Sequence, residues 1–459
     1  MPRPYAARSW EWSGDRRALT FHLVPTIKWH DGQPTTASDV AFTILAGRDP
    51  VTGYARNADL APIDTVIVAN DSTATVRFRN PQSSFPLIFC ELPIVPAHLL
   101  GEVQRSEMKR AAFNSHPVGN GPFRFVERRV GQLWRFARND SFPAALGGPA
   151  KIGGIVVAVV DEATTKFAGL ASGDLDVAGI SPTMASLASR DPSLRVVEYP
   201  ILFTTGMVLN THRPPFDDAR VRRAIDLAVD RRRIISVALA GFGTPAYGPV
   251  PPESPLALSD QRQVNPSLSD SLLDAAGWSR SGSGTRTRAG KPFTFDLLTV
   301  GSSDNAIEQL IQSDLAAHGI RLEIRQMELG AFLTEARAPT KRYDALITGV
   351  SGDVMLSYVA AMFEGAQRGG SLDYAAFHTA NLDAAFSATR TAMTDVARRD
   401  AWLSVQRQLV ESMPVVWLYH SRGVQGVSAR LGGIRMDLRG ELASVATWQP
   451  IGPPGARAK

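Results

Sequence analysis

Short segments with alternating apolar and polar residues dominate the first third of the chain. The segment LTFHLV (residues 19–24) alternates in this way, a turn follows at 30–32, and residues 63–68 and 73–79 repeat the pattern. Such alternation is typical of strands with one buried face. A further hairpin is expected on the two sides of Gly131. This part of the chain is therefore expected to form antiparallel sheet.

One helix is expected among these strands. Ser38 and Asp39 supply an N-cap signal before the apolar segment VAFTILAG, and Gly47 marks its end. Four prolines between residues 81 and 96 predict an irregular packed segment. The single cysteine, Cys90, lies in that apolar segment, so we expect an inert buried thiol there.

From Gly154 onward, the pattern changes to strands that alternate with helices. An apolar strand at 155–160, a capped helix at 161–173 and a short strand at 174–180 predict a βαβ unit. A longer run of the same kind, βαβαβ, covers residues 293–350 and predicts a second, separate parallel sheet. The sequence therefore predicts two α/β lobes, with a hairpin-rich subdomain inserted in the first.

The composition fits a folded protein of several domains. The chain has 459 residues, of which 44% are hydrophobic and 20% charged, which disfavours a disordered or fibrous protein. The longest uncharged apolar run, Ile152 to Val160, is much shorter than the roughly 20 residues of a membrane-spanning helix. The segment from Met1 to Arg17 lacks the apolar stretch of a secretory signal.

The positive charge is spread evenly along the chain. The formal net charge is +5, but residues 1–213 contribute +3 of it and residues 214–459 contribute +2, so neither half is a basic lobe. Nucleic acid is therefore not expected as a partner. The densest arginine cluster alternates with Asp226 and Asp230 at helical spacing, which favours a solvated helix face. Its members are Arg222, Arg223, Arg231, Arg232 and Arg233.

Motifs for catalysis, cofactors and metals are weak or missing in the sequence. GFGTPA at Gly241 only partly fits a dinucleotide fingerprint, since it follows a predicted helix and leads into prolines. GVSGD at Gly349 misses the last glycine of a nucleophile elbow. The eight histidines are scattered singly, without the spacing of a zinc site. We therefore expect no catalytic residue, no cofactor and no metal ligand.

Several phrases, among them WHDG at residues 29–32, TASDV at 36–40 and GNGPF at 119–123, stand in an order that resembles extracellular solute-binding protein family 5, the dipeptide-, oligopeptide- and nickel-binding proteins of ABC importers. Two motifs carry most of the resemblance, a W-H-D-G turn that leads into a T-A-x-D-V helix, and a G-x-G-P-[YF] hairpin. Later phrases such as LASGDLDVAGI, GFGTPAYGPVPP and LVESMPVVWLYH also match, so the resemblance covers essentially the whole chain. The matching positions of the two motifs are Trp29, His30, Asp31, Gly32, Thr36, Ala37, Asp39 and Val40, and Gly119, Gly121, Pro122 and Phe123.

The resemblance implies an α/β fold of the two-lobed, periplasmic-binding-protein-like type II class. Each lobe would be a mixed sheet flanked by helices, and two strands would cross between the lobes, near Leu209 to Thr211 and near Val416 to His420. The expected domains are the lobe I core at 1–35 (incomplete at its N-terminus) and 150–213, its inserted subdomain at 36–149, lobe II at 214–415, and a crossing strand with the return to lobe I at 416–459.

The resemblance also implies a function. The protein would capture a small peptide or another amine-bearing solute, or nickel in a chelate, between its lobes and deliver it to the permease of an ABC importer, without acting as an enzyme. The alternative is a hydrolase that uses the cleft between the lobes, with Ser351 or Asp353 as its reactive group. A monomer without cofactor is expected. Location would be periplasmic or lipid-anchored at the cell surface.

The expected ligand site centres on GVSGD, which matches the family's G-W-x-G stretch before an Asp that holds the peptide amino group. Val350 replaces the usual Trp, and Asp304 to Ala306 stand where dipeptide-binding members tend to have an Arg. A longer peptide or another amine is therefore favoured over a plain dipeptide. The residues expected to contact the ligand are Asp353, Ser351, Gly349, Thr204, Thr205 and Asn120.

The start of the chain departs from the family pattern. Family members normally carry an export signal and several dozen residues before the stretch that resembles SWEW at residues 9–12. We expect either a truncated or misassigned start, or a first lobe built without those strands, in which case an unpaired sheet edge and uncovered apolar surface would invite association.

Overall fold

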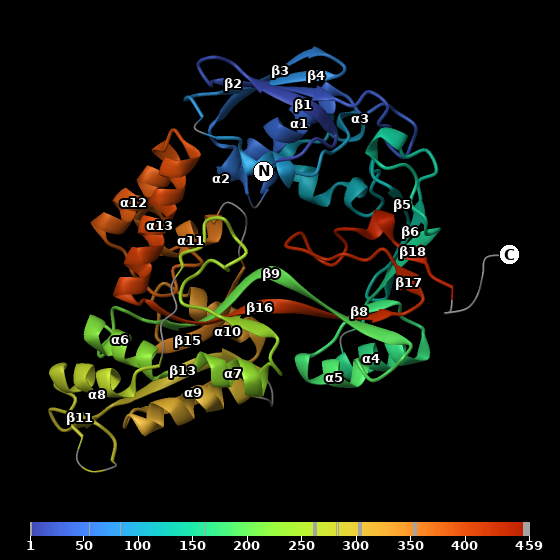
Figure 1. The fold of residues 1–459 in the computed structure, drawn as a ribbon. Helices are drawn as coiled ribbons and strands as arrows, with labels where there is room; N and C mark the ends of the chain where they lie inside the picture. Colours follow the sequence, from blue (N-terminus) through green and yellow to red (C-terminus); the bar gives the residue numbers. More distant parts are fainter. Residues whose placement is uncertain are drawn as a thin grey trace.

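The protein is a mixed α/β molecule with several separate sheets. The computed structural model describes residues 2–54, 56–82, 84–160, 162–259, 264–280, 282, 284–301, 305–351 and 356–452. An upper unit (residues 5–116) lies above a larger base, and a three-stranded sheet connects the two on one side (Figure 1). None of the helices in the described ranges combines the length and apolar character that crossing a membrane requires.

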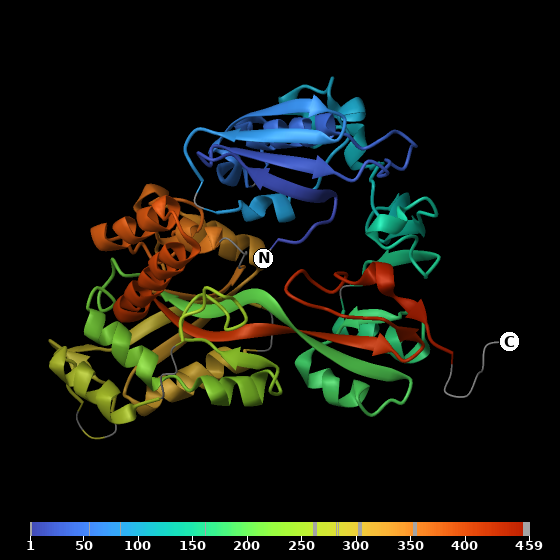
Figure 2. The ribbon, with the colours of Figure 1, turned by 45° about the horizontal axis from the view of Figure 1, so that its top comes forward.

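The upper unit is an antiparallel sheet packed on one main helix. Its strand order is β1-β2-β4-β3, and α1 lies against the sheet (Figure 2). β2 alternates between buried and half-buried residues, as its sequence predicts. The elements are β1 (Ala7–Trp12), β2 (Ala18–Leu23), α1 (Ala37–Arg48), α2 (Asn57–Leu60), β3 (Ile63–Asn70), β4 (Thr73–Phe78) and α3 (Ala97–Leu100).

The structure corrects two predictions in the upper unit. The N-cap of α1 is Thr36 rather than Ser38 or Asp39, and Asp39 is the third helical residue of a capping box, whose carboxylate accepts from the Thr36 backbone N–H at 2.7 Å. Cys90 is exposed rather than buried. Its pKa is raised by partial burial, which keeps the thiol protonated.

The predicted βαβ unit after Gly154 is wrong in its topology. β7 (Gly154–Ala158) pairs antiparallel with β6 (Leu133–Arg138), which itself pairs with β5 (Phe123–Arg129), so these three form a sheet of their own. β8 (Val177–Gly179) pairs with another strand, β16, in the large sheet. A short apolar run carries no information about its partner strand, and in β7 the run is not even buried.

A seven-stranded sheet runs through the base. Two long strands, β9 (Leu194–Leu209) and β16 (Val415–Ser428), pair antiparallel along almost their whole length, and we call this pair the central ribbon. One half of the ribbon continues into β15, β13 and β14, and the other half pairs with β8. The remaining strands of this sheet are β10 (Gly243–Pro245), β13 (Thr294–Val300), β14 (Arg321–Met327) and β15 (Ala345–Ser351).

The βαβαβ run at 293–350 is confirmed, since β13 pairs parallel with both β14 and β15. Its sheet is not separate, however, because β15 pairs antiparallel with β9 of the central ribbon. The strands, together with residues 203–209 and 415–421 of the ribbon, form the sheet of lobe II. From the lobe II sheet the ribbon runs past a shift in register near Pro200 and Arg422 to its pairing with β8, and we call this stretch the crossing. The lobe crossings expected near Leu209 to Thr211 and near Val416 to His420 stay predictions.

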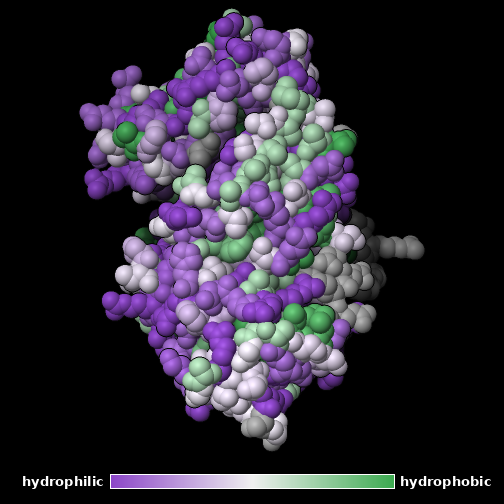
Figure 3. All heavy atoms as spheres, turned by 90° about the vertical axis from the view of Figure 1, so that its left-hand side faces the viewer, coloured by the Kyte–Doolittle hydropathy of each residue, from purple (hydrophilic) through white to green (hydrophobic). Residues whose placement is uncertain are grey.

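Helices cover both faces of the lobe II sheet. Apolar residues of β9 alternate between two cores, with Met207 in one and Val208 in the other. The first core takes in α6 (Ala219–Ala228), α7 (Arg231–Ala238), α8 (Pro266–Ala275) and α9 (Ala306–Ala317). The second takes in α10 (Leu329–Arg337), α11 (Ser357–Phe363), α12 (Ala380–Thr391) and α13 (Asp395–Ser412). Hydrophilic residues predominate on the outer side of lobe II (Figure 3).

A smaller core lies at the other end of the ribbon. It packs α4 (Ala163–Ser172) and α5 (Ala185–Ala188) against β8, β9 and β16. Two short strand pairs complete the described structure, β11 (Thr287–Arg288) with β12 (Lys291–Pro292) and β17 (Leu431–Gly432) with β18 (Gln449–Pro450). β2 and β4 pair in one sheet, although the domain boundary expected at residue 35 lies between them in the sequence. The domain boundaries as a whole stay a prediction.

The arginine cluster of α6 and α7 is only partly a solvated face. Arg222 and Arg231 are both 5% exposed. Arg231 donates to the carbonyl oxygens of Ala246 at 2.9 Å and Trp417 at 2.6 Å, and forms an ion pair with the buried carboxylate of Asp226. Charged side chains become buried where such partners satisfy them. Arg231 therefore fastens α7 to the sheet, and Arg222 joins α6 to the end of α13 through the Ser412 carbonyl oxygen, so the prediction was wrong for both.

Candidate functional site

The start of α11, the helix that follows β15, contacts the upper unit. α11 follows soon after β15, and its first residue, Ser357, donates from Oγ to Asp59 Oδ1 at 3.4 Å. Asp59 belongs to α2 of the upper unit and also accepts from Arg56 Nε at 2.8 Å. Ligands of α/β proteins gather at the carboxyl ends of parallel strands and between domains. The region between β15 and the upper unit is therefore the candidate site.

The central ribbon is irregular at the same place. Its register shifts between His420 and Arg422, so that residues 201–203 of β9 face a single residue of β16, Ser421. Such bulges redirect side chains and are frequent next to functional sites. Phe203, the last bulged residue, stays 37% exposed and pairs in register with Ser351 of β15. The bulge thus presents an aromatic ring at the carboxyl end of β15.

Gly349 lies directly under that ring. A Cβ at this position would stand 1.9 Å from Phe203 Cζ, so only glycine leaves room for the ring. Gly423 of β16 has the same relation to Tyr199, whose ring would lie 2.2 Å from its Cβ. The structure therefore gives Gly349 a packing role, and its contact with a ligand stays a prediction.

Thr204 is buried within the ribbon, at 2% exposure. Its hydroxyl lies 2.9 Å from His420 Nδ1 and 3.2 Å from the Pro249 carbonyl oxygen. The carbonyl can only accept, so the hydroxyl donates to it, or to the imidazole in its place. Burial lowers the pKa of His420 to about 4, so the ring is neutral at physiological pH. Thr204 thus holds the ribbon to the proline-rich segment between α7 and α8.

Thr205 belongs to a neighbouring buried polar group. Its hydroxyl bonds with that of Tyr419, whose pKa is raised by burial. The Glu308 carboxylate, near the start of α9, lies close enough to act on Tyr419 and accepts from Thr299 Oγ1 at 2.6 Å. Glu308 is 8% exposed. The group places a buried carboxylate and hydroxyls at the carboxyl end of β13, next to the strands that carry the other predicted residues.

Asn120 lies in another part of the molecule, in the loop that leads from the upper unit to β5. Its Nδ2 donates to Thr35 Oγ1 at 3.3 Å. The register of β9 and β15 brings Thr204, Thr205 and Gly349 together on adjoining strands, with the backbone of Ser351 beside them. The structure therefore brings four of the six predicted residues together and places Asn120 elsewhere. The sixth, Asp353, lies outside the described residues.

Sequence reasoning missed the charged residues of the crossing. Arg422 of β16 pairs with Glu198 of β9, and its Nη1 lies 2.9 Å from Glu253 Oε1. Arg422 is therefore the centre of an ion-pair group that ties both ribbon strands to the proline-rich segment between α7 and α8. The available signal was a pair of charges, Glu198 and Arg422, inside otherwise apolar crossing strands.

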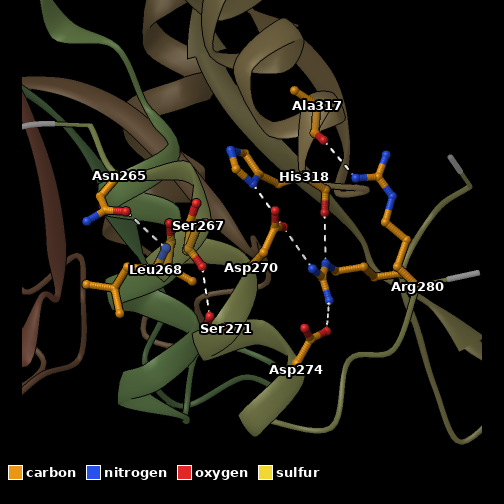
Figure 4. A network of polar contacts seen from close by, with 12 residues as sticks. Asn265, Ser267, Leu268, Asp270, Ser271, Asp274, Arg280, Ala317 and His318 are labelled. Atoms are coloured by element: carbon orange, nitrogen blue, oxygen red, sulfur yellow. Dashed lines mark hydrogen bonds and ion pairs between the residues drawn. The ribbon is translucent and has the colours of Figure 1, made fainter. Parts of the chain in front are cut away.

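A second polar cluster lies far from this site and holds lobe II together. The Asp270 carboxylate of α8 lies between His318 Nδ1 at 3.0 Å and the guanidinium of Arg286 at 2.8 Å (Figure 4). Arg286 is 3% exposed and also donates to the His318 carbonyl oxygen at 3.0 Å. The cluster joins α8 to the end of α9, so it is a structural joint. The surface hollow of about 600 Å³ beside it lies along α9 and β14, away from the crossing.

In the parts of the chain that the structure describes, no three His, Cys, Asp or Glu side chains converge as a metal site would require. What the candidate site offers is an exposed aromatic ring, strand backbone, buried hydroxyls and carboxylates, on surfaces that face each other across a crossing. Such a site can hold an elongated polar molecule by backbone hydrogen bonds and stacking.

Sequence comparison gives one family and several relatives. A model described as bacterial extracellular solute-binding proteins, family 5 Middle, matches residues 1–368. Protein XP55 of Streptomyces lividans is 27% identical over 448 residues, which cover 96% of this chain and 79% of that protein. The oligopeptide-binding protein AppA of Bacillus subtilis is 24% identical over 436 residues, with 92% of this chain and 79% of AppA covered.

Solved structures share the fold. AppA from Bacillus subtilis in complex with a nonapeptide superposes with a TM-score of 0.79 at 24% identity and covers 97% of this chain and 90% of its own. NikZ from Campylobacter jejuni in complex with Ni(L-His) gives a TM-score of 0.83 at 21% identity, with the same coverage. The two-lobed fold expected from the sequence is thereby confirmed.

Proposed function

This chain belongs to the bacterial extracellular solute-binding proteins of family 5, and on that premise we propose that it captures a peptide or a related amine-bearing solute between its lobes and hands it to the permease of an ABC importer. Binding and release would make and break no covalent bond. The protein would work as a monomer, in the periplasm or lipid-anchored at the cell surface.

The observation that carries the proposal is the central ribbon. β9 and β16 belong to both parts of the base, and their bulge sets Phe203 beside the carboxyl end of β15. Rotation of one lobe against the other would therefore move Phe203 and β15 relative to the upper unit, where Ser357 meets Asp59. Hinge closure around a ligand needs this geometry.

The ligands of two relatives and the residue Asp353 after β15 both bear on the class of ligand. AppA binds a nonapeptide and NikZ binds Ni(L-His), so the fold accommodates both elongated and compact amine-bearing ligands. Asp353, which follows β15, is proposed to hold the ammonium group. The exposed edge of Phe203 and the strand backbone suit a chain of several residues better than a small chelate, so a peptide is our first choice.

The proposal is tested by identifying what the protein retains. Native mass spectrometry of the purified protein should show one small molecule bound per chain and released unchanged. Added back at 100 times its dissociation constant, this molecule should stabilise the fold by about 2.7 kcal/mol and make the scattering profile more compact. If peptides, amine solutes and nickel chelates all leave both quantities unaltered, or if the molecule is converted with turnover, the proposal fails.

Asp353→Asn tests the proposed anchor. Asn caps a turn or helix about as well as Asp, so the melting temperature of the free protein should stay nearly the same. Loss of the charge facing an ammonium in a closed site should weaken binding about thirtyfold, roughly 2 kcal/mol, in calorimetric titration. Asp395→Asn, at an exposed helix start of lobe II, is the matched control. An affinity within about threefold of the parent would remove Asp353 from the site.

A further inference from the structure

His30 fastens the loop of residues 117–122 to the upper unit. Its backbone N–H donates to the Gly119 carbonyl oxygen at 2.8 Å. Its ring makes two more bonds to the same loop, with the Gly119 N–H 3.3 Å from Nδ1 and the Gly121 carbonyl oxygen 3.0 Å from Nε2. A Cβ on Gly119 would stand 3.1 Å from the ring, so the loop lies directly against it. The His30 ring therefore forms hydrogen bonds with both ends of a Gly-Asn-Gly turn.

These bonds require one protonation state. A backbone N–H can only donate, so Nδ1 must offer its lone pair, and a carbonyl can only accept, so Nε2 must carry the proton. The ring is thus neutral in the Nε2–H form. A second proton on Nδ1 would remove the acceptor for Gly119 N–H and bring two donors face to face.

The groups around the ring also favour the neutral form. Burial and the nearby guanidinium of Arg124 on β5 lower the pKa of His30, while the bond to Gly121 and the carboxylate of Asp31 act in the opposite direction. Asp31 is itself bound by His98 Nε2 of α3 at 2.7 Å. Asn139, which is neutral, donates to the same Gly121 carbonyl oxygen at 3.1 Å. The net effect is a lowered pKa, so protonation begins only in acid.

The loop that His30 binds is also the connection between two parts of the molecule. The chain leaves the upper unit through residues 117–122 and enters β5 directly afterwards. We propose that His30 is an acid-sensitive clasp, which fixes the joint between the upper unit and the three-stranded sheet while the ring is neutral and releases it on protonation. The proposal goes beyond the proposed function and does not rest on it. For a protein outside the cell, the clasp would couple the setting of the upper unit to external pH.

Hydrogen exchange of the whole protein tests the clasp. Peptide fragments covering residues 117–122 are followed by mass spectrometry over a pH series from about 7.5 to about 5, and their rates are divided by those of the same unstructured peptide. Protection of this loop should fall about tenfold as His30 is protonated. Fragments from α1, in the same unit, should keep theirs. Equal loop protection over the whole series would overturn the proposal.

Variants separate the clasp from general acid effects. His30→Gln offers one acceptor and one donor at every pH, so its loop should stay protected across the series, whereas His30→Ala should have an unprotected loop throughout. His98→Gln, which alters the partner of Asp31 only, is the matched control and should follow the parent. If His30→Gln does not fold, ¹³C-histidine NMR of the parent decides, since an Nδ1–H form at neutral pH would overturn the assignment. A loop that loosens equally in His30→Gln would also overturn it.

Discussion

The seven-stranded sheet and the three-stranded sheet differ in how they are covered. In lobe II, residues 207–209 of β9 and 415–418 of β16 are all buried, because helices pack on both faces. In the three-stranded sheet, every residue of β5, β6 and β7 is at least partly exposed. Val156 and Val157 face opposite sides of β7 and are 56% and 42% exposed.

Because the two sheets are covered differently, we expect them to differ in stiffness. A sheet buried on both faces is fixed by packing over its whole area, so lobe II can serve as a rigid reference. The three-stranded sheet is held by its backbone hydrogen bonds and by a few half-buried ring contacts such as that of Phe125 with Phe136, and regions with few buried contacts open locally at low free energy. It connects the base to the upper unit, so we expect this connection to deform more easily than lobe II.

Among the variants compared, Arg231→Met should lower the free energy of unfolding most, and it acts on lobe II. Arg231→Met removes the guanidinium that pairs with the buried Asp226 carboxylate and that donates to the Ala246 and Trp417 carbonyl oxygens. A loss of about 3 to 5 kcal/mol of unfolding free energy is expected in denaturant titration. Arg232→Met, at the exposed neighbouring position, should change it by less than about 0.5 kcal/mol. Similar losses in both variants would contradict the assigned role.

Acid should weaken the same sheet through His420. Its pKa is about 4 in the fold against 6.5 for the free side chain, because burial disfavours the charged ring. The unfolded chain therefore binds this proton more tightly. Stability should be full above about pH 6.5 and fall toward pH 4, by about 3 kcal/mol in total. His420→Gln should flatten this part of the stability curve, whereas His116→Gln, at an exposed position, should leave its slope unaltered.

A pair of matched valines compares the two sheets directly. Val208→Ala removes two methyl groups from a site that is 1% exposed and should cost about 2 kcal/mol. Val156→Ala makes the same change in the three-stranded sheet and should cost less than about 0.5 kcal/mol. Both values come from the same denaturation experiment. A cost at Val156 close to that at Val208 would mean that the face of β7 is covered in solution, and the contrast between the sheets would disappear.

The sequence predicted elements better than their partners. The βαβαβ run was predictable because long periodic segments specify both type and order. The places of β7 and β8 were not, since pairing in different sheets depends on contacts far along the chain. Arg222 and Arg231 were assigned to a solvated face because helical spacing with Asp226 looks the same whether that face meets water or the backbone carbonyl oxygens of neighbouring elements.

The site was predictable in outline only. The position of GVSGD after the third strand of the run placed it at a sheet edge, and the structure has Gly349 and Ser351 there. Phe203 could not be predicted, because its exposure follows from a bulge set by the register of two strands distant in sequence. Thr204 and Thr205 lie in a segment that is buried on both faces, where alternation does not tell which hydroxyl meets a ligand. Asn120 was a family-based choice, and the structure places it at the upper joint.

The pairing of β9 with β16 also limits how the lobes can move. Two separate linkers could bend, slide or stretch independently, but hydrogen bonds tie these strands into one band on both sides of the crossing. A band of this kind resists extension and shear in its plane, because either would break its hydrogen bonds. The longer of its two interruptions, between His420 and Arg422, leaves three residues of β9 opposite one of β16. We therefore expect the two ends of the base to move as a single hinge that bends at this interruption, and not to slide past each other or draw apart.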